Sequence, residues 1–267
     1  MIGNLFERLR DMNRAALAPF IECGDPDMDF TERLIAKACE SGADIIELGV
    51  PFSDPMADGP VIQAASNRAL AGGANLPKIF DMTARLRSAG VDRKFVLFSY
   101  LNPLFKFGIE RAAELSAESG IDAWLVVDAP LEESREVGIP AAKCGLDFIP
   151  LASATTPIDR VSKISDSGSG FLYYVTVAGV TGARSALPES FAKRLAEVRA
   201  ASRLPVAAGF GISTPEMARA AAASADAVVV GSAFVGLVHS VRLASGEAAA
   251  LEAAGDFISS FASAVRR

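Results

Sequence analysis

The sequence predicts a single α/β domain over residues 1–267, folded as a (β/α)8 TIM barrel. Short apolar runs alternate eight times with longer helical segments, and such alternation is typical of parallel strands joined by right-handed crossovers. The chain has 267 residues, of which 51% are hydrophobic, and this length fits one barrel better than two domains. An open doubly wound sheet is the second choice. Against it, the first run is followed by Glu22-Cys23-Gly24-Asp25-Pro26 instead of a glycine-rich dinucleotide turn.

The eight apolar runs predict the strands. Each is rich in β-branched or aromatic residues, is too short for a helix, and ends near Gly, Pro, Asn or Asp. The runs cover residues 17–21, 43–50, 95–100, 123–127, 147–151, 171–177, 205–210 and 227–230.

The segments between the runs predict helices. Apolar residues recur at spacings of three and four, for example over 30–40 and 109–119. Helical sequence also lies before the first strand, at 2–13. Two segments, 60–72 and 76–90, lie between the second and third strands. The barrel should therefore carry an extra N-terminal helix and an extra helix after strand 2.

Helix start and stop signals agree with these boundaries. Thr156-Pro157 and Thr214-Pro215 each predict an N-cap followed by proline at the first helical position. Glycine stands after a helical run and before a strand at four places, where it is expected to end the helix. These glycines are Gly42, Gly90, Gly120 and Gly145.

Composition excludes several function classes. The net charge is −6 with no basic block, which argues against a nucleic-acid partner. The N-terminal segment is broken by charges, so it predicts neither a signal sequence nor a membrane span. Cys23, Cys39 and Cys144 stand far apart, as expected of reduced thiols in a cytoplasmic protein. His239 is the single histidine of the sequence, which argues against most histidine-based metal sites, and no metal is expected.

The exit of the second strand holds the most informative motif, Glu47-Leu48-Gly49-Val50-Pro51-Phe52-Ser53-Asp54-Pro55-Met56-Ala57-Asp58-Gly59-Pro60. A lone Glu47 in an apolar run is costly to bury unless it is used or hydrogen-bonded. A second carboxylate, on a stiff loop, can face the first across a pocket and support acid/base chemistry. From these residues alone a structural interpretation stays open, with Glu47 capping a strand end and Asp54 and Asp58 forming turns.

Three later strand exits share a glycine-containing sequence. They are 178–184, which includes Gly179 and Gly182, then 209–213, and then Gly231-Ser232. Glycine lets backbone N–H groups approach an anion, and a following helix start adds its positive end. The loops after the last three strands of such a barrel often bind phosphate. Aromatic residues at other exits, including Phe20, Phe98 and Tyr100, can line an apolar part of the pocket.

These motifs, in this order, resemble the tryptophan synthase alpha chain family. The resemblance runs from about Leu5 to the last helix, and its most specific part is the motif that contains Glu47 and Asp58. It implies cleavage of indole-3-glycerol phosphate to indole and glyceraldehyde 3-phosphate. It also implies that Glu47 is the general acid/base and that Asp58 is the second catalytic carboxylate, which stays ionised and accepts the indole N–H.

The resemblance also implies binding residues and a partner. Substrate-binding positions are Phe20, Tyr100, Tyr173, Thr181, Gly182, Gly211, Gly231 and Ser232. Thr181 is further expected to hydrogen-bond Asp58. Asp54, Asn102 and Pro103 match contacts to a beta chain, with which the alpha chain forms an α2β2 heterotetramer. The alpha chain is expected to need no cofactor, and pyridoxal phosphate is expected only in the beta chain.

The sequence departs from the family's usual pattern at three positions. Glu22 stands where Thr is common, Cys23 follows it, and Val177 stands where some members have Arg. Three alternatives to the partner-dependent lyase remain at this point. They are a free-standing indole-releasing lyase, a non-catalytic barrel that only activates a beta chain, and another phosphosugar barrel enzyme.

Overall fold

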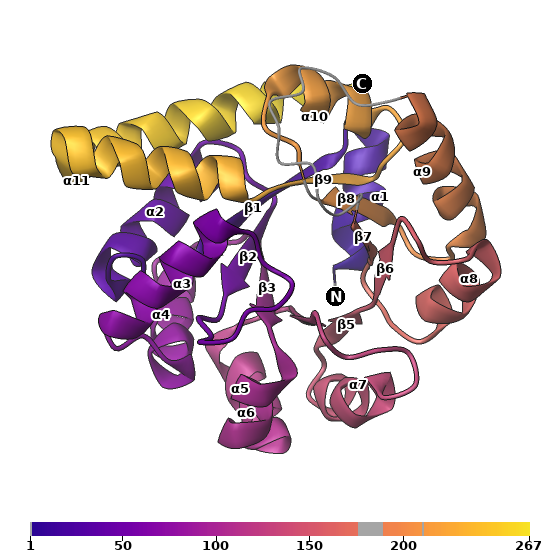
Figure 1. The fold of residues 1–267 in the computed structure, drawn as a ribbon, viewed down its shortest axis with the longest axis horizontal. Helices are drawn as coiled ribbons and strands as arrows, with labels where there is room; N and C mark the ends of the chain where they lie inside the picture. The colour runs from indigo at the N-terminus through magenta and orange to yellow at the C-terminus, as the bar shows by residue number, and fades with distance from the viewer. Residues whose placement is uncertain (1, 176–188, 210) are drawn as a thin grey trace.

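The computed structural model describes residues 2–175, 189–209 and 211–267 of the chain. Its centre is a ring of parallel strands surrounded by helices, as Figure 1 shows. The strands are β1 (Ala16–Glu22), β2 (Ile45–Gly49), β3 (Lys94–Ser99), β4 (Ala123–Val126), β5 (Asp147–Ile149), β6 (Leu151–Ser153), β7 (Leu172–Val175), β8 (Val206–Gly209) and β9 (Ala227–Val230).

The nine strand segments occupy the eight positions of a (β/α)8 barrel. Their order is β5-β4-β3-β2-β1-β9-β8-β7-β6, and β5 and β6 are consecutive pieces of one strand, divided at Pro150. Proline cannot donate a ladder hydrogen bond, but its carbonyl accepts the N–H of Tyr173 at 2.9 Å. The predicted strand at 147–151 thus exists, runs on to Ser153, and joins the two ends of the sheet.

Helices follow the strands around the ring (Figure 1). They are α1 (Gly3–Asp11), α2 (Met28–Glu40), α3 (Pro60–Ala71), α4 (Leu76–Ser88), α5 (Leu101–Phe107), α6 (Ile109–Ser119), α7 (Ser134–Lys143), α8 (Ile158–Asp166), α9 (Glu189–Ala201), α10 (Pro215–Ala222) and α11 (Ser232–Ala264). The predicted extra N-terminal helix is α1, and the predicted extra helix after strand 2 is confirmed because two helices, α3 and α4, lie between β2 and β3. Over the described ranges, none of the helices is both long and apolar enough to cross a membrane.

Two local features differ from the sequence predictions. Thr214 caps α10 as predicted, but α8 starts at Ile158 with Pro157 as its N-cap. Thr156 does not cap this helix, because its hydroxyl accepts the N–H of Ser153 at 3.0 Å. The short helix α5 was not predicted. All four glycines expected to end helices have positive φ angles, a conformation that suits glycine.

Alternation along the strands divides the core into two layers. Phe20, Val96 and Tyr173 belong to the cluster inside the barrel, whereas Leu48, Leu97 and Trp124 belong to the layer between the strands and the helices. Successive strand residues point to opposite faces, so position in the strand decides the layer. Glu47 lies between two outward-facing residues of β2, and its side chain therefore points into the barrel.

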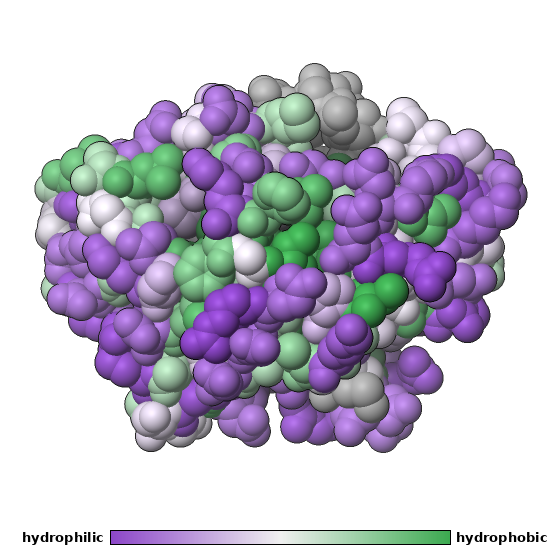
Figure 2. All heavy atoms as spheres, turned by 90° about the horizontal axis from the view of Figure 1, so that it is seen from below, coloured by the Kyte–Doolittle hydropathy of each residue, from purple (hydrophilic) through white to green (hydrophobic). Residues whose placement is uncertain are grey.

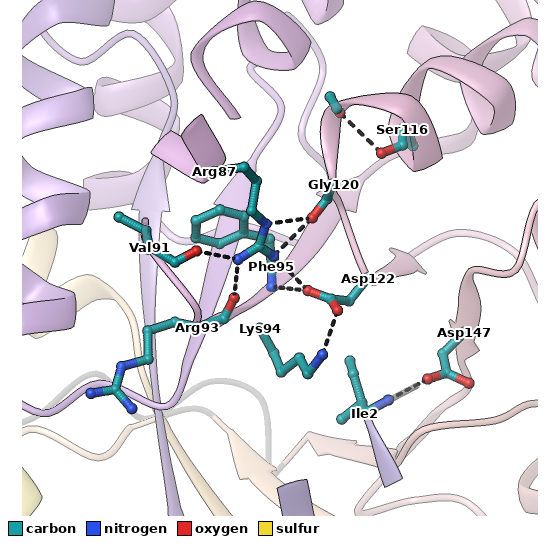
Figure 3. A network of polar contacts seen from close by, with 11 residues as sticks. Ile2, Arg87, Val91, Arg93, Lys94, Phe95, Ser116, Gly120, Asp122 and Asp147 are labelled. Carbon is teal, nitrogen blue, oxygen red and sulfur yellow. Dashed lines mark hydrogen bonds and ion pairs between the residues drawn. The ribbon is translucent and has the colours of Figure 1, made fainter. Parts of the chain in front are cut away.

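Helix α1 closes the amino-terminal end of the barrel. Ile2, Leu5, Phe6 and Leu9 are buried with the interior cluster, and the Phe6 ring meets Phe171 edge-on at 5.7 Å. The backbone N–H of Ile2 donates to the Asp147 carboxylate at 2.7 Å (Figure 3). A substrate can therefore enter only from the opposite, carboxyl-terminal end, where barrel enzymes have their active sites.

Aspartates at the start of three other strands tie the strands together at this end. Asp44, Asp122 and Asp226 accept backbone N–H groups of the neighbouring strand, from Leu17, Phe95 and Val206 respectively, at 2.9–3.0 Å. Hydrogen bonds from N–H groups to a charged acceptor are stronger than neutral ones. These carboxylates therefore stabilise the fold and are not available for chemistry.

Arg87 organises the polar network between β3 and β4 (Figure 3). Its guanidinium donates to the carbonyls of Gly120, Val91 and Arg93 at 2.7–2.9 Å and to Asp122 at 2.8 Å. The same group lies 4.0 Å from the centre of the Phe95 ring. The planar guanidinium can satisfy several fixed acceptors at once, which the ammonium group of lysine cannot do.

We expect Arg87→Ala to lower the free energy of unfolding by about 2–4 kcal/mol, because it leaves the carbonyls of Gly120, Val91 and Arg93 without this donor and removes one of the donors to Asp122. Denaturant unfolding of the two proteins measures this difference. The matched control is Arg111→Ala, which removes an exposed i,i+3 pair with Glu114 and should cost less than about 0.5 kcal/mol. Equal effects of the two substitutions would contradict the assigned role of Arg87.

Candidate active site

A cavity of about 350 Å³ opens at the carboxyl-terminal end of the barrel. Glu47 of β2 and Asp58, from the loop before α3, both line it. The residues that line the cavity are Phe20, Glu47, Asp58, Gly59, Ile62, Phe98, Tyr173, Gly211, Ile212, Ser213, Val229, Gly231, Ser232 and Ala233. Seven predicted site residues meet here, although they come from loops and strands distant in the sequence.

Glu47 is fully buried, and neither carboxyl oxygen has a hydrogen-bond partner among the described residues. Burial in these apolar surroundings raises the pKa of Glu47 from 4.5 to about 8, because the charged form loses its hydration. Glu47 is therefore mainly protonated at neutral pH. A neutral carboxylic acid that points into a cavity is suited to donate a proton to a bound molecule.

Asp58 has a different environment. It is half-buried, and its Oδ2 accepts a hydrogen bond from the Tyr100 hydroxyl at 2.9 Å. Burial raises the pKa of Asp58, while the hydrogen bond from Tyr100 opposes this shift. Two carboxyl groups with such different surroundings can have different charge states in one pocket.

Tyr100 supports this loop instead of lining the large cavity. Its hydroxyl accepts the backbone N–H of Ala57 at 3.0 Å as it donates to Asp58. The ring packs against Phe52 at 5.3 Å between centroids. The structure therefore places Tyr100 behind Asp58, and its assignment to substrate binding stays a prediction.

Aromatic rings form one wall of the cavity. Phe98 meets Phe20 edge-on at 5.2 Å and Tyr173 at 6.3 Å. A Cβ atom at Gly209 would lie 2.5 Å from the Tyr173 hydroxyl oxygen, so glycine there leaves room for this ring. The apolar wall suits a flat aromatic group, which buries its faces against such rings.

Another part of the cavity lining has the features of an anion site. Gly231 is the N-cap residue of α11 without a side-chain cap, and Ser232 is the first residue of that helix. Uncapped N–H groups and the positive end of the helix attract a negative group. Gly211, in the loop after β8, has a φ of 78°, a conformation that favours glycine.

Other positions singled out in the sequence are not among the described residues that line the cavity. Thr181 and Gly182, together with the departure at Val177, lie outside the described residues. Of the other two departures, Cys23 is buried as a free thiol. Glu22, the last residue of β1, is buried next to the cavity.

Asp54, Asn102 and Pro103 lie outside the cavity. Asp54 is exposed in the loop after β2, and Asn102 and Pro103 belong to the first turn of α5. Two large apolar side chains nearby in the sequence are exposed, Met56 at 84% and Phe105 at 70%. Figure 2, which views the side of the molecule that carries α5 and α6, shows hydrophobic groups set among polar ones.

Sequence reasoning missed part of the site. Ile62 of α3 and Val229 of β9 line the cavity, but nothing in their local sequence separates them from ordinary core residues. The hydrogen bond between Tyr100 and Asp58 was also missed, because 42 residues separate the two in the chain. Within the described ranges, no cluster of three or more His, Cys, Asp or Glu side chains could hold a metal ion.

Comparison with known protein families gives one match over most of the chain. The family model for the tryptophan synthase alpha chain matches residues 6–265. The tryptophan synthase alpha chain of Geobacter sp. strain M21 is 50% identical over 234 residues, or 88% of this chain and 87% of the relative. That of Gluconacetobacter diazotrophicus is 44% identical over 247 residues, or 92% and 90% of the two chains.

Solved structures agree with these sequence relatives. Tryptophan synthase subunit alpha from Legionella pneumophila strain Paris superposes with a TM-score of 0.91 at 37% identity, covering 99% of this chain and 97% of the other. A chain of Mycobacterium tuberculosis tryptophan synthase superposes with a TM-score of 0.89 at 31% identity, covering 100% and 98%.

Proposed function

This chain belongs to the tryptophan synthase alpha chain family, and from this premise we propose how its cavity performs the family's reaction. The alpha subunit is a carbon–carbon lyase of tryptophan biosynthesis that cleaves indole-3-glycerol phosphate to indole and glyceraldehyde 3-phosphate. The residue assignments rest on one observation. Glu47 is buried, its carboxyl oxygens have no hydrogen-bond partner among the described residues, and it lines the same cavity as Asp58.

The bond to be broken joins indole C3 to the first carbon of the glycerol chain. Protonation of C3 converts the ring into an electron acceptor and leaves positive charge on the indole nitrogen. When the bond breaks, its electron pair restores the ring, and the side-chain hydroxyl loses a proton to become the aldehyde. One proton enters and one leaves, so the reaction needs acid/base groups and no net redox change.

We assign the proton transfers to Glu47. Its pKa of about 8 keeps it protonated near neutral pH, as the donation to C3 requires. After donation the carboxylate is the base that removes the proton of the side-chain hydroxyl. A group whose pKa lies near the working pH can perform both steps with small energetic penalties.

Asp58 is assigned to the indole nitrogen. Its ionised form accepts the indole N–H and stabilises the positive charge that develops there. The donation from the Tyr100 hydroxyl favours this ionised form and fixes the carboxylate. Phe20 and Tyr173 would hold the indole ring, while Gly211, Gly231 and Ser232 would bind the phosphate at the other end, together with Gly182. Thr181 is proposed as a further partner of Asp58.

The beta chain of tryptophan synthase is the partner of this subunit. We propose that the exposed surface around Asp54, Asn102 and Pro103 contacts it, since Met56 and Phe105 expose apolar area beside these residues. The alpha chain works without a cofactor of its own in this proposal, and pyridoxal phosphate resides in the beta chain.

We further propose that residues 1–267 form one domain and that the protein lies in the cytoplasm. The scattered free cysteines support this location.

The wild-type chain, assayed with and without a beta chain, tests the proposed function. We expect release of indole from indole-3-glycerol phosphate that rises when the beta chain is added, with a stable complex of α2β2 mass. High turnover by the chain alone that the beta chain does not change would favour a free-standing lyase. No cleavage in either case would favour a non-catalytic barrel and contradict the proposal.

A further inference from the structure

Glu22 is a second buried acid beside the active site. It is the last residue of β1 and is 4% exposed, and its Oε1 has no hydrogen-bond partner in the described part of the chain. It pairs in register with Gly49, where a Cβ atom would lie 2.9 Å from the Glu22 Oε2 atom. The glycine therefore leaves room at the inner face of the barrel for both the Phe20 ring and the Glu22 carboxyl group.

Glu22 and Asp58 share a small pocket next to the main cavity. Tyr100 and Ser66 also line this pocket, whose volume is about 10 Å³. Such a space holds about one water molecule, so it cannot admit the substrate. Glu22 can therefore influence the reaction only through its neighbours. Phe20, Phe98 and Asp58 line both the small pocket and the main cavity, and of these three only Asp58 has an ionisable side chain that a charge on Glu22 would repel.

We propose that Glu22 is a positioning residue for Asp58, which it supports as a neutral acid and disturbs once it loses its proton. This inference rests on the role assigned to Asp58 in the proposed function. A negative charge in the small pocket would repel the Asp58 carboxylate from its place on the Tyr100 hydroxyl. Glu22 would thus add an alkaline limit to activity, separate from the loss of the Glu47 proton.

The charged groups around Glu22 favour its neutral form on balance. Burial raises the pKa of Glu22 from 4.5 to about 8, and the charges of Asp58 and Asp25 act in the same direction. From α3, Ser66 and Arg68 oppose the shift, but Arg68 is already bound to Asp25 at 2.7 Å through two hydrogen bonds.

The remaining titratable groups nearby do not supply a counter-charge. The pKa of Cys23 is raised by burial and by Glu22 itself, so this thiol stays neutral. The pKa of Tyr100 is raised by burial and by Asp58. His239 of α11 faces the Arg68–Asp25 pair, and burial lowers its pKa. A Glu22 carboxylate would therefore have a hydrogen bond from Ser66 but no cation of its own.

The test compares pH profiles of kcat/KM for indole-3-glycerol phosphate cleavage by the wild type and Glu22→Gln, each with the beta chain. We expect similar activity at pH 7 and the same acidic limb. Above pH 8, a plot of log(kcat/KM) against pH should approach a slope of −2 for the wild type, because Glu22 and Glu47 each lose a proton. The variant should approach a slope of −1, because only Glu47 ionises. Relative to pH 7, the variant should keep about tenfold more activity than the wild type at pH 9.

Controls separate this role from a structural one. Glu110→Gln changes an exposed residue of α6 and should reproduce the wild-type profile. Glu22→Thr, which also cannot ionise, replaces Glu22→Gln if the latter does not fold, and should show the same slope of −1. A wild-type slope in a folded variant, or an equal loss of activity at every pH, would overturn the proposal.

A separate measurement distinguishes failure of the proposed function from failure of the proposal for Glu22. If the wild type does not cleave the substrate at all, the proposed function fails. Thermal unfolding still reports on Glu22 in that case, because a buried acid with a raised pKa loses its stabilising contribution as pH rises toward 8. Between pH 7 and pH 9 the wild type should then lose more stability than Glu22→Gln, and equal losses would show that Glu22 is not a buried neutral acid.

Discussion

Glu47→Gln is expected to lower kcat/KM for indole-3-glycerol phosphate cleavage by 10²–10⁴-fold, the usual contribution of a positioned acid/base group. Glutamine has the same shape as the neutral acid but cannot transfer a proton to C3 or take one from the hydroxyl. KM should change little, because the aromatic wall and the phosphate end stay intact. Steady-state indole release with saturating beta chain measures the effect, and Glu118→Gln, an exposed change on α6, is the matched control.

The free energy of unfolding of Glu47→Gln provides a second test. The substitution should lower activity but raise stability at alkaline pH. The folded-state pKa of Glu47 is raised from 4.5 to about 8, so its contribution to stability is full below pH 4.5. It is lost progressively as pH rises through 8. Glu47→Gln cannot ionise and should therefore be more stable than the wild type at pH 9, on the order of a few kcal/mol. At pH 4, where the side chain is mostly protonated in both the folded and the unfolded state, little gain is expected. A variant that is equally active, or less stable at pH 9, would contradict the description of Glu47 as a buried neutral acid.

Asp58→Asn should lower kcat by about 10²–10³-fold, because it removes the negative charge that stabilises the positive indole nitrogen. The amide keeps the size of the side chain and can still accept the Tyr100 hydrogen bond, so the loop should keep its place. The same cleavage assay measures this loss. Asp81→Asn, an exposed change on α4, controls for a general effect of losing one charge.

A second variant tests the support that Tyr100 gives to Asp58. Tyr100→Phe removes the hydroxyl that donates to Asp58 and accepts from Ala57, and should cost about tenfold in kcat, less than the loss of the carboxylate itself. An effect of Tyr100→Phe on KM alone would show that Tyr100 touches the substrate, as the resemblance implied.

For the carboxylate itself, an unchanged rate of cleavage by Asp58→Asn would contradict the catalytic role assigned to Asp58.

The sequence by itself determined the barrel and the identity of its main acidic groups. Short apolar runs and amphipathic helices depend on neighbours in the chain, so the eight strand positions and the extra helices could be predicted from local pattern. The helix ends at Gly42 and Gly120, which have positive φ angles, could also be predicted from the local sequence, because the signal that ends a helix is local. The local pattern failed at Thr156, whose hydroxyl is held by Ser153, and it did not reveal α5.

Only the tertiary structure decided how the site residues relate to one another. It placed Tyr100 behind Asp58, Ile62 and Val229 in the cavity wall, and Glu22 in the space that Gly49 leaves open. It also made Glu47 a neutral acid, since its pKa depends on apolar side chains from other strands. Contacts between distant segments, and the desolvation that they cause, arise only when the barrel closes, and no local stretch of sequence contains them.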